Sequence, residues 1–458
     1  MYAMTGLWFE SALLPSGWAT HVRITAGGGG TIEHVTAGTQ AQPGDERHAI
    51  ALPGLPNVHS HAFQRGLAGL TERRGTGADS FWSWRELMYQ FVERIGPEEL
   101  EAVSALCFAE MLEAGFTHVG EFHYLHHDRD GTPYADRGEL AGRIAAAAAH
   151  SGIGLTLLPV FYAHGGFGGA AAAPRQRRFI SDPEGFAAIV EACRRAVRPL
   201  AGASVGVAPH SLRAVTPQEL SAIVALAHDG IVHLHIAEQA REVEECVAWS
   251  GRRPIEWLLE NQPVGERWCL VHATHASAAE LAGIAARRAV VGLCPITESN
   301  LGDGIFPAVP FHAHHGRMGV GSDSNILLDA AAELCTLEYS QRLTHRGRNV
   351  LAAGAGASTG RSLFDAALAG GSQVLGERLA ATGLAPGCPL NLVSLNAGHS
   401  ALLERRGDEI MDSWIFAAGR GAIDCVWRAG ERLVSGGRHR DRDALIARYA
   451  QALRRLRA

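Results

Sequence analysis

Histidine and carboxylate side chains that could bind a divalent metal recur at the ends of apolar segments. The apolar stretch 55–64 contains His59 and His61, and on a β-strand residues two positions apart point to the same side. Two neutral imidazoles placed in this way make half of a site for zinc or a related metal. A His-x-His pair is a weak signal alone, because such residues more often lie in a core or on a surface. Its weight depends on matching ligands elsewhere.

Matching residues follow five later apolar segments, in the order of the chain. They are Glu121, His123 and Tyr124; His210 and Arg213; His235, Glu238 and Gln239; His272 and His275; and Ser322, Asp323, Ser324 and Asn325. One metal site can be made from three imidazoles and one carboxylate: His59, His61, His235 and Asp323. A water in its open position would have its pKa lowered to about 7. We expect Glu238 to carry protons and His272 to hold or orient the hydroxide.

Any one of the 23 histidines is better explained by ordinary packing than by metal binding. His233 is expected in the core between the strands. Surface positions are expected for His312, His314 and His315, and a role in shaping the pocket for His123, His126 and His127. Chance is a poor explanation for the whole set, because His-x-His, His-x-x-Glu, His and Gly-Ser-Asp-Ser occur in order at successive strand ends.

Eight predicted strands alternate with helices and position these residues. The strands are expected at 54–59, 117–123, 154–162, 204–209, 231–237, 267–272, 289–294 and 317–322. Helices are expected at 97–114, 183–197, 217–228 and 276–287, with a long helical stretch at 328–381. This α/β pattern predicts a (β/α)8 TIM barrel whose active site lies at the carboxyl ends of the strands. The glycine-rich segment 165–169 lacks a phosphate-loop motif and is expected to be a mobile loop over the barrel mouth.

The two ends of the chain have the pattern of short strands broken by turns. Residues 1–52 and 386–440 are expected to pair into one small β-sandwich, with C-terminal strands at 390–395, 410–415, 423–428 and 431–434. They flank a hydrolase barrel at 53–385. Residues 441–458 are predicted to form a closing helix whose basic face is solvated.

Composition excludes several classes of protein. A net charge of −6 argues against general nucleic-acid binding, and no apolar segment approaches the roughly 20 residues that span a bilayer. No secretory signal pattern begins the chain, so we expect a cytoplasmic protein. The eight cysteines lack a Cys-x-x-Cys pair and are expected to be buried free thiols. The sequence contains no lysine, which excludes a Schiff base or a lysine carbamate that bridges two metals.

Four motifs resemble the amidohydrolase superfamily, in its mononuclear deaminase branch. They are Pro-Gly-Leu-Pro-Asn-Val-His-Ser-His, His-Ile-Ala-Glu-Gln, Val-His-Ala-Thr-His and Gly-Ser-Asp-Ser-Asn. Within that branch nearly the whole chain is similar to the formimidoylglutamate deiminase family. The segments 81–85, 120–124, 165–169, 176–179 and 209–215 carry this closer resemblance.

The resemblance implies hydrolysis of N-formimino-L-glutamate to N-formyl-L-glutamate and ammonia, a step of histidine degradation. It implies one Zn²⁺ per chain on His59, His61, His235 and Asp323, with Glu238, His272 and Asp323 as catalytic residues. It places five side chains on the substrate: Gln64, Arg85, Tyr124, His210 and Arg213. Arginine suits the two substrate carboxylates, because its donors form a planar fork. Arg85 also has an alternative interpretation as an ordinary surface arginine.

Several alternatives remain open from the sequence alone. The same chemistry could act on an aminated purine, a pterin or another formimino-amino acid, and a catalytically silent barrel could serve as a binding protein. The ligand set does not distinguish zinc from iron or manganese. A homodimer is implied by the resemblance only.

Overall fold

Two parallel sheets carry the polar strand ends in the computed structural model, which describes residues 6–75, 77, 79–376 and 383–457. In the first sheet, β5 (Leu55–Ser60), β6 (Phe116–His123), β7 (Gly154–Phe161) and β8 (Ser204–Val205) are neighbours, and β9 (Ala208–Pro209) pairs with β7. The second contains β10 (Val232–Ile236), β11 (Trp268–His272), β12 (Val290–Leu293) and β13 (Arg317–Val320). All eight predicted strands are therefore present, the fourth as two short pieces.

The two sheets meet at both of their outer edges. Val207 forms a parallel bridge with Val232, and Ser60 forms one with Asp323. At the second junction the backbone N–H of Asp323 donates to His59 O at 2.9 Å, and that of His61 donates to Asp323 O at 2.9 Å. The backbone of the predicted metal ligands is thus part of the contact between sheets.

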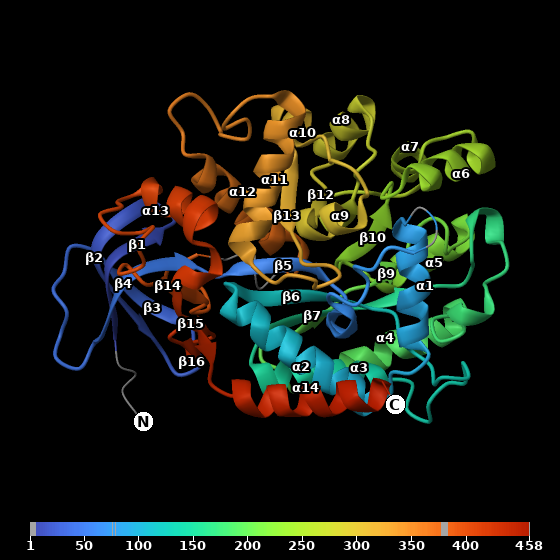
Figure 1. Cartoon of the computed structure of the whole chain (residues 1–458), viewed down its shortest axis with the longest axis horizontal. Coiled ribbons are helices and arrows are strands. Elements are labelled where there is room, and N and C mark those ends of the chain that lie inside the picture. The colour runs from blue at the N-terminus through green and yellow to red at the C-terminus, as the bar shows by residue number, and fades with distance from the viewer. Residues whose placement is uncertain (1–5, 76, 78, 377–382, 458) are drawn as a thin grey trace.

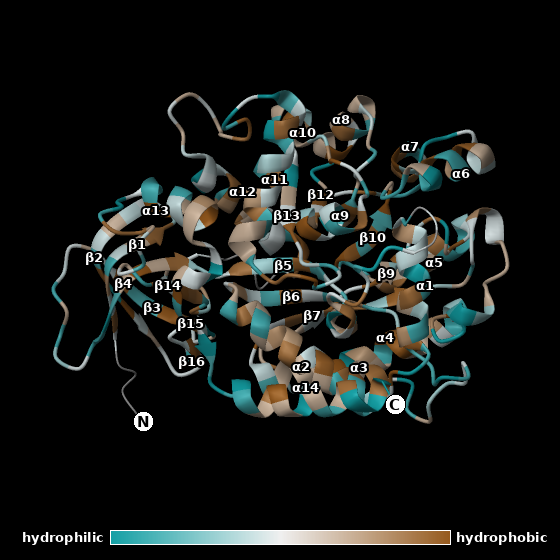
Figure 2. Ribbon diagram, viewed as in Figure 1, coloured by the Kyte–Doolittle hydropathy of each residue, from teal (hydrophilic) through white to brown (hydrophobic). Residues whose placement is uncertain are grey.

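Helices surround these strands (Figure 1). They are α2 (Pro97–Glu113), α3 (Glu139–Ser151), α4 (Pro183–Val197), α5 (Pro217–Leu226), α6 (Ala240–Ser250), α7 (Pro254–Asn261), α8 (Ala278–Ala286), α9 (Pro295–Leu301), α10 (Ala308–Ala313), α11 (Ala330–His345) and α12 (Thr359–Val374). The four helices predicted by residue range are confirmed as α2, α4, α5 and α8. Proline at the first helical position fits the starts of α2, α4 and α5, where its missing N–H costs nothing. Apolar side chains dominate α2, which lies between the strands and the C-terminal helix (Figure 2).

The predicted helical stretch 328–381 is wrong as one unit, because it consists of two helices. Helix α11 ends where Arg346 takes a left-handed backbone with φ 52°. Helix α12 begins after Ser358, whose hydroxyl accepts the N–H of Arg361 at 2.9 Å. The end of the predicted stretch, 377–381, lies outside the described residues.

The N- and C-terminal segments form one eight-stranded sheet. Its order is β17 (Arg438–His439), β16 (Glu431–Ser435), β15 (Ile423–Arg428), β14 (Leu392–Leu395), β4 (Glu46–Pro53), β1 (Leu7–Leu14), β2 (Gly17–Ala26) and β3 (Ile32–Thr36). The antiparallel pair β14–β4 joins the two ends of the chain, as predicted. A small separate core, which includes Phe9, Ile24, Leu392 and Trp427, packs on this sheet.

The strand predicted at 410–415 is wrong, because these residues form helix α13 (Asp408–Ser413) and a following π-turn, Trp414–Ala418. The buried residues Ile410, Met411, Trp414 and Ile415 are spaced as on one helix face. Asp412 fixes the helix by accepting the backbone N–H of Gly360 at 2.7 Å.

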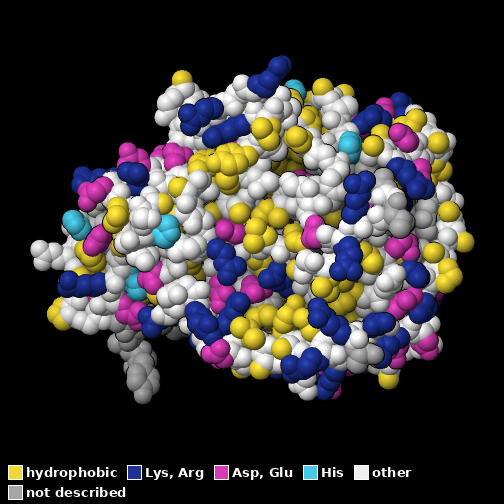
Figure 3. All heavy atoms as spheres, in the orientation of Figure 1, with side chains coloured by type: hydrophobic (Ala, Val, Ile, Leu, Met, Phe, Trp, Pro, Cys, Tyr) yellow, Lys and Arg dark blue, Asp and Glu magenta, His cyan; other side chains and the backbone are white. Residues whose placement is uncertain are grey.

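The predicted closing helix is α14 (Arg442–Arg457), which packs on α2. Its partly exposed arginines pair with acidic residues of α2: Arg442 contacts Glu110 at 3.0 Å, and Arg455 contacts Glu98 at 2.6 Å. Blue and magenta side chains accordingly intermix along this edge (Figure 3). All eight cysteines are free and only Cys335 is partly exposed, which confirms the prediction of free thiols. Within the described ranges, no helix combines the length and apolar character needed to cross a membrane.

Candidate active site

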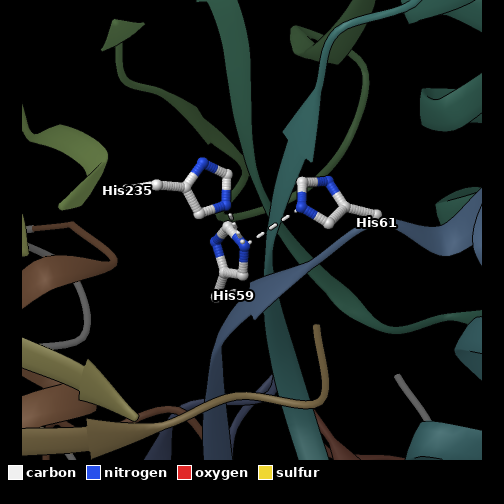
Figure 4. A group of neighbouring side chains, drawn as sticks. All are labelled: His59, His61 and His235. Atoms are coloured by element: carbon white, nitrogen blue, oxygen red, sulfur yellow. Dashed lines mark hydrogen bonds between the residues drawn. The ribbon is translucent and has the colours of Figure 1, made fainter. Parts of the chain in front are cut away.

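Three predicted metal ligands converge at the ends of β5 and β10 (Figure 4). His59 Nε2 lies 3.2 Å from His61 Nε2 and 3.0 Å from His235 Nε2. Asp323 Oδ1 completes the group, 3.4 Å from His61 Nε2 and 3.6 Å from His59 Nε2. Ligands that bind one zinc ion at 2.0–2.1 Å lie roughly 2.9–3.4 Å apart, so the imidazole spacing fits such an ion.

The ring orientation of two of these histidines also fits metal binding. His61 Nδ1 lies 3.0 Å from Phe122 O, and His235 Nδ1 lies 3.1 Å from His210 O. Since a carbonyl only accepts, each Nδ1 carries the proton, and each Nε2 keeps a lone pair for the metal. Burial lowers the pKa of His61 to about 3 and holds the pKa values of His59 and His235 well below their usual range. Three neutral rings that could act as metal ligands are therefore grouped here.

Asp323 is held in place by buried amides. Its backbone is left-handed, with φ 45°, three residues after the end of β13. Asn325 Nδ2 donates to Asp323 O and to His61 O, each at 3.0 Å, and Asn57 Nδ2 donates to Ser322 Oγ at 2.7 Å. Burial raises the pKa of the Asp323 carboxyl to about 7. These contacts explain why polar residues surround Asp323 in the sequence.

Two further groups face the same centre. His272 Nε2 lies 3.8 Å from both Glu238 Oε1 and Asp323 Oδ2. Burial lowers the pKa of His272, but the nearby carboxylates, Glu238 first, outweigh this effect and raise it to about 10. The geometry thus places a basic imidazole and a carboxylate beside the predicted metal ligands, where protons could be exchanged.

One cavity collects the remaining predicted residues. It is lined by His61, Gln64, Arg85, Tyr124, His210, Arg213, His235, Glu238, His272 and Asp323. Gln64 Nε2 donates to the Tyr124 hydroxyl at 2.9 Å. The structure therefore brings together every predicted substrate-binding residue, and their individual roles remain predictions.

Two arginines line this cavity, and each has an N–H group that lacks a hydrogen-bond acceptor among the described residues. The Nε atoms of Arg85 and Arg213 are buried, and neither has a hydrogen-bond partner among the described residues. Their guanidinium carbons lie 4.6 Å and 5.8 Å from the ring centre of Trp82. A buried donor without a partner is costly, so each arginine has a donor available to a hydrogen-bond acceptor in the cavity.

Sequence reasoning missed several cavity residues. Helix α1 (Phe81–Val92) contributes Trp84, Met88 and Tyr89 to the cavity in addition to Arg85. Tyr162 and Phe179 line the same cavity from other elements. The aromatic cluster at 81–84 was the available signal. Gln176 Nε2 donates to the Tyr162 hydroxyl at 2.7 Å, which gives part of the 176–179 segment a supporting role.

The histidines expected to have other roles are placed as follows. His233 is fully buried and lies 2.8 Å from Val374 O, and His312, His314 and His315 are exposed, as predicted. His123, His126 and His127 are buried but do not line the cavity. In the glycine-rich loop, Phe167 stacks on Trp249 at 5.6 Å, and the mobility of this loop remains a prediction.

Two family models match the chain. The amidohydrolase family matches residues 50–433, and the N-terminal domain of formimidoylglutamate deiminase HutF matches residues 4–49. Formimidoylglutamate deiminase from Pseudomonas aeruginosa is 48% identical over 98% of this chain and 99% of its own length. An 8-oxoguanine deaminase from the same organism is 28% identical over 93% of this chain and 92% of its own.

Solved structures show the same fold. An amidohydrolase from Brucella melitensis is 55% identical, has a TM-score of 0.96 and covers 99% of this chain and 100% of its own. An adenosine deaminase from Xanthomonas campestris, solved with bound zinc, has a TM-score of 0.81 at 24% identity and covers 99% and 98% of the two chains.

Proposed function

The chain belongs to the amidohydrolase family and, within it, to the formimidoylglutamate deiminases; from this premise we propose that it hydrolyses N-formimino-L-glutamate to N-formyl-L-glutamate and ammonia. It is a hydrolase that acts on a C–N bond. The substrate assignment rests on the buried Nε donors of Arg85 and Arg213. Both arginines line a cavity that is also lined by Glu238 and by three of the four proposed metal ligands, His61, His235 and Asp323.

We propose one Zn²⁺ per chain, held by His59, His61, His235 and Asp323. The support is the 3.0–3.2 Å spacing of three neutral imidazoles and the adjacent carboxylate. When bound, the metal acts as a Lewis acid and lowers the pKa of a water molecule toward neutrality.

The side chains around the ligands would move the protons of the reaction. Water oxygen adds to the formimino carbon while the C=N π electrons pass to nitrogen, and Asp323 Oδ2 accepts the water proton beside His272 Nε2. The formimino group enters as a cation, so its terminal nitrogen becomes –NH2 when it takes these electrons. Glu238 Oε1 then takes the remaining proton of the added hydroxyl and delivers it to that nitrogen. The carbon–nitrogen bond then breaks and ammonia leaves, with the carbonyl of the formyl group formed from the added oxygen. The 3.8 Å distances from His272 Nε2 to both carboxylates support this assignment.

The substrate carries two carboxylates, and the two arginines would bind them. Guanidinium groups form paired, charge-assisted hydrogen bonds to carboxylates. Gln64, Tyr124 and His210 would complete the contacts, and the Gln64–Tyr124 hydrogen bond orients two of these groups. A neutral nucleobase would offer no carboxylate to the buried Nε donors of Arg85 and Arg213, which favours the acyclic dicarboxylate over an aminated ring.

We propose that the two parallel sheets close into one (β/α)8 barrel over 53–385, supported by the bridges Val207–Val232 and Ser60–Asp323. Residues 1–52 and 386–440 would form the small β-sandwich around the separate core of Phe9 and Trp427. Residues 1–5, 76, 78 and 377–382 of these ranges lie outside the described part. A homodimer is proposed from the family resemblance alone, and size-exclusion chromatography with light scattering would test it. A cytoplasmic location is proposed because it is consistent with an enzyme of histidine degradation.

Ammonia release from N-formimino-L-glutamate, with N-formyl-L-glutamate identified as co-product, tests the proposed function. Turnover that is lost on chelation and regained with zinc is the expected result. A protein with one equivalent of zinc that leaves this substrate unchanged, while it deaminates a purine or a pterin, would overturn the substrate assignment. A protein that holds well under one equivalent of zinc and turns over no substrate would overturn the proposal that it is an enzyme.

A further inference from the structure

The imidazole of His272 is held at its Nδ1 atom by a buried carboxylate. Glu298 Oε1 lies 3.2 Å from that nitrogen, and the two side chains are 1% and 6% exposed. The Nε2 atom of the same ring faces Glu238 and Asp323. The ring therefore links Glu298 to the two carboxylates that the proposed reaction uses.

The carboxylate of Glu298 is fixed by the first turn of α9. Glu298 Oε1 accepts the backbone N–H of Cys294 at 2.9 Å, and the N–H of Glu298 donates to Cys294 O at 2.9 Å. His272 has a left-handed backbone with φ 70°, a conformation that costs a non-glycine residue energy and occurs often at functional sites. Both members of the pair are thus held in defined positions by their own backbones.

The partner of Nδ1 distinguishes His272 from the metal ligands. His61 and His235 donate from Nδ1 to backbone carbonyls, which are neutral acceptors. His272 meets a carboxylate instead, and a carboxylate at Nδ1 orients the ring, fixes its tautomer and stabilises a protonated imidazole. The ring of His272 is thus oriented by a charged partner at Nδ1, while its Nε2 lies 3.8 Å from each of the carboxylates of Glu238 and Asp323.

Building on the proposed function, we propose that Glu298 is a positioning residue for the deimination. It keeps a proton on His272 Nδ1 and turns Nε2 toward the reacting atoms between Glu238 and Asp323. Glu298 acts through His272 and does not touch the substrate, which agrees with its absence from the cavity lining.

A double-mutant cycle tests this role. Glu298→Met removes the acceptor and is expected to lower kcat by about 10²–10⁴-fold with KM changed less than about threefold. Glu298→Gln keeps an acceptor oxygen and should recover part of the loss. In a His272→Asn background, Glu298→Met should add less than about threefold, because its effect passes through the missing ring. Losses that multiply in the double variant would overturn the proposal.

Glu333→Met is the matched control. Glu333 is a fully buried carboxylate that accepts the N–H of Ile296 at 2.9 Å, and its replacement disturbs the same region of the core. Its kcat should stay within about threefold of the wild type. A loss as large as that of Glu298→Met would mean that any buried carboxylate here supports activity through the fold, and would overturn the specific role.

A measurement without substrate separates this proposal from the proposed function. In zinc-loaded protein labelled with ¹⁵N-histidine, the signal lost in His272→Asn identifies the ring. In the wild type this signal should show the proton on Nδ1. In Glu298→Met, at equal zinc content, it should show the proton shared between Nδ1 and Nε2. An unchanged tautomer would overturn the inference even if the enzyme hydrolyses its substrate. The expected tautomer in a protein without turnover would uphold the positioning role and overturn the substrate only.

Discussion

His59 Nε2 and His235 Nε2 lie 3.0 Å apart, although 176 positions separate the two residues in the chain. His59 is at the end of β5 in one parallel sheet, and His235 is at the end of β10 in the other. Three neutral nitrogens with their lone pairs directed at one point repel each other and are cut off from water. The cation that would satisfy them should therefore also stabilise the folded chain.

Removing the metal should lower the thermal stability of the protein. A ligand that binds the folded chain alone adds about 2.7 kcal/mol when its free concentration is one hundred times its Kd. We expect dialysis against a chelator to lower Tm by several degrees and zinc to restore it. His235→Ala should have the Tm of the metal-depleted wild type whether or not zinc is added. It should also retain less than one equivalent of zinc. Equal Tm values for the dialysed and zinc-loaded wild type would contradict this expectation.

The sequence could predict that these polar residues converge because strand ends in a parallel α/β fold meet at one edge. His59, Glu238 and Asp323 each follow an apolar run closely enough that the order of strands alone brings them together. Glu298 could not be found in this way, because it lies on the first turn of α9 rather than at a strand end. Its role depends on a side-chain rotamer and one hydrogen bond, and neither leaves a periodic signal.

The errors at the C-terminal side have a similar physical basis. Residues 410–415 contain isolated apolar residues that suit a short strand or a helix turn equally well. In the fold they pack beside α12, where the N–H of Gly360 donates to Asp412 Oδ1. The break between α11 and α12 depends on the left-handed backbone of Arg346, and an arginine does not predict this conformation. Tertiary contacts, rather than local preference, determine both.

Replacing Arg213 should weaken binding of the dicarboxylate substrate more than it slows the chemical step. Its guanidinium is buried and faces the cavity, so Arg213→Gln should reduce kcat/KM by about 10²–10³-fold, mostly through KM. Arg241→Gln is a suitable control, because Arg241 also lies over Trp82 but is exposed. Steady-state kinetics of both variants would measure the difference. A small effect of Arg213→Gln would indicate that the anionic end of the substrate binds elsewhere.

Acid should destabilise the protein through its buried neutral histidines. Burial lowers the pKa of His118 to about 3, and its Nε2 lies 2.8 Å from the Thr156 hydroxyl. The unfolded chain binds this proton near pH 6.5 and the folded chain only near pH 3, so its stabilising contribution is complete above pH 6.5 and falls as the pH drops. Between pH 6.5 and 5 one such group costs about 2 kcal/mol.

Urea unfolding at pH 5 and pH 7 would measure this effect at constant zinc. The free energy of unfolding of His118→Asn should fall less between the two pH values than that of the wild type, by about 2 kcal/mol. His312→Asn, at an exposed position, should follow the wild type. If the free energy of unfolding falls equally between pH 7 and pH 5 in His118→Asn and in the wild type, His118 is protonated in the folded protein.

Gly321 leaves no room for a side chain beside His59, one of the proposed metal ligands. A Cβ atom there would lie 2.8 Å from both the backbone N and O of His59, which are held in the junction between the two sheets. Because neither backbone atom can move without shifting His59, Gly321→Ala should destabilise the fold by about 1–3 kcal/mol and reduce zinc retention. Gly354→Ala provides the control, since its Cβ would meet no described atom within 4 Å and its φ is not left-handed. Chemical denaturation and metal analysis of the two variants would compare them. A Gly321→Ala protein with full zinc content and wild-type stability would show that the strand junction tolerates displacement and that the ligand geometry is not fixed by this contact.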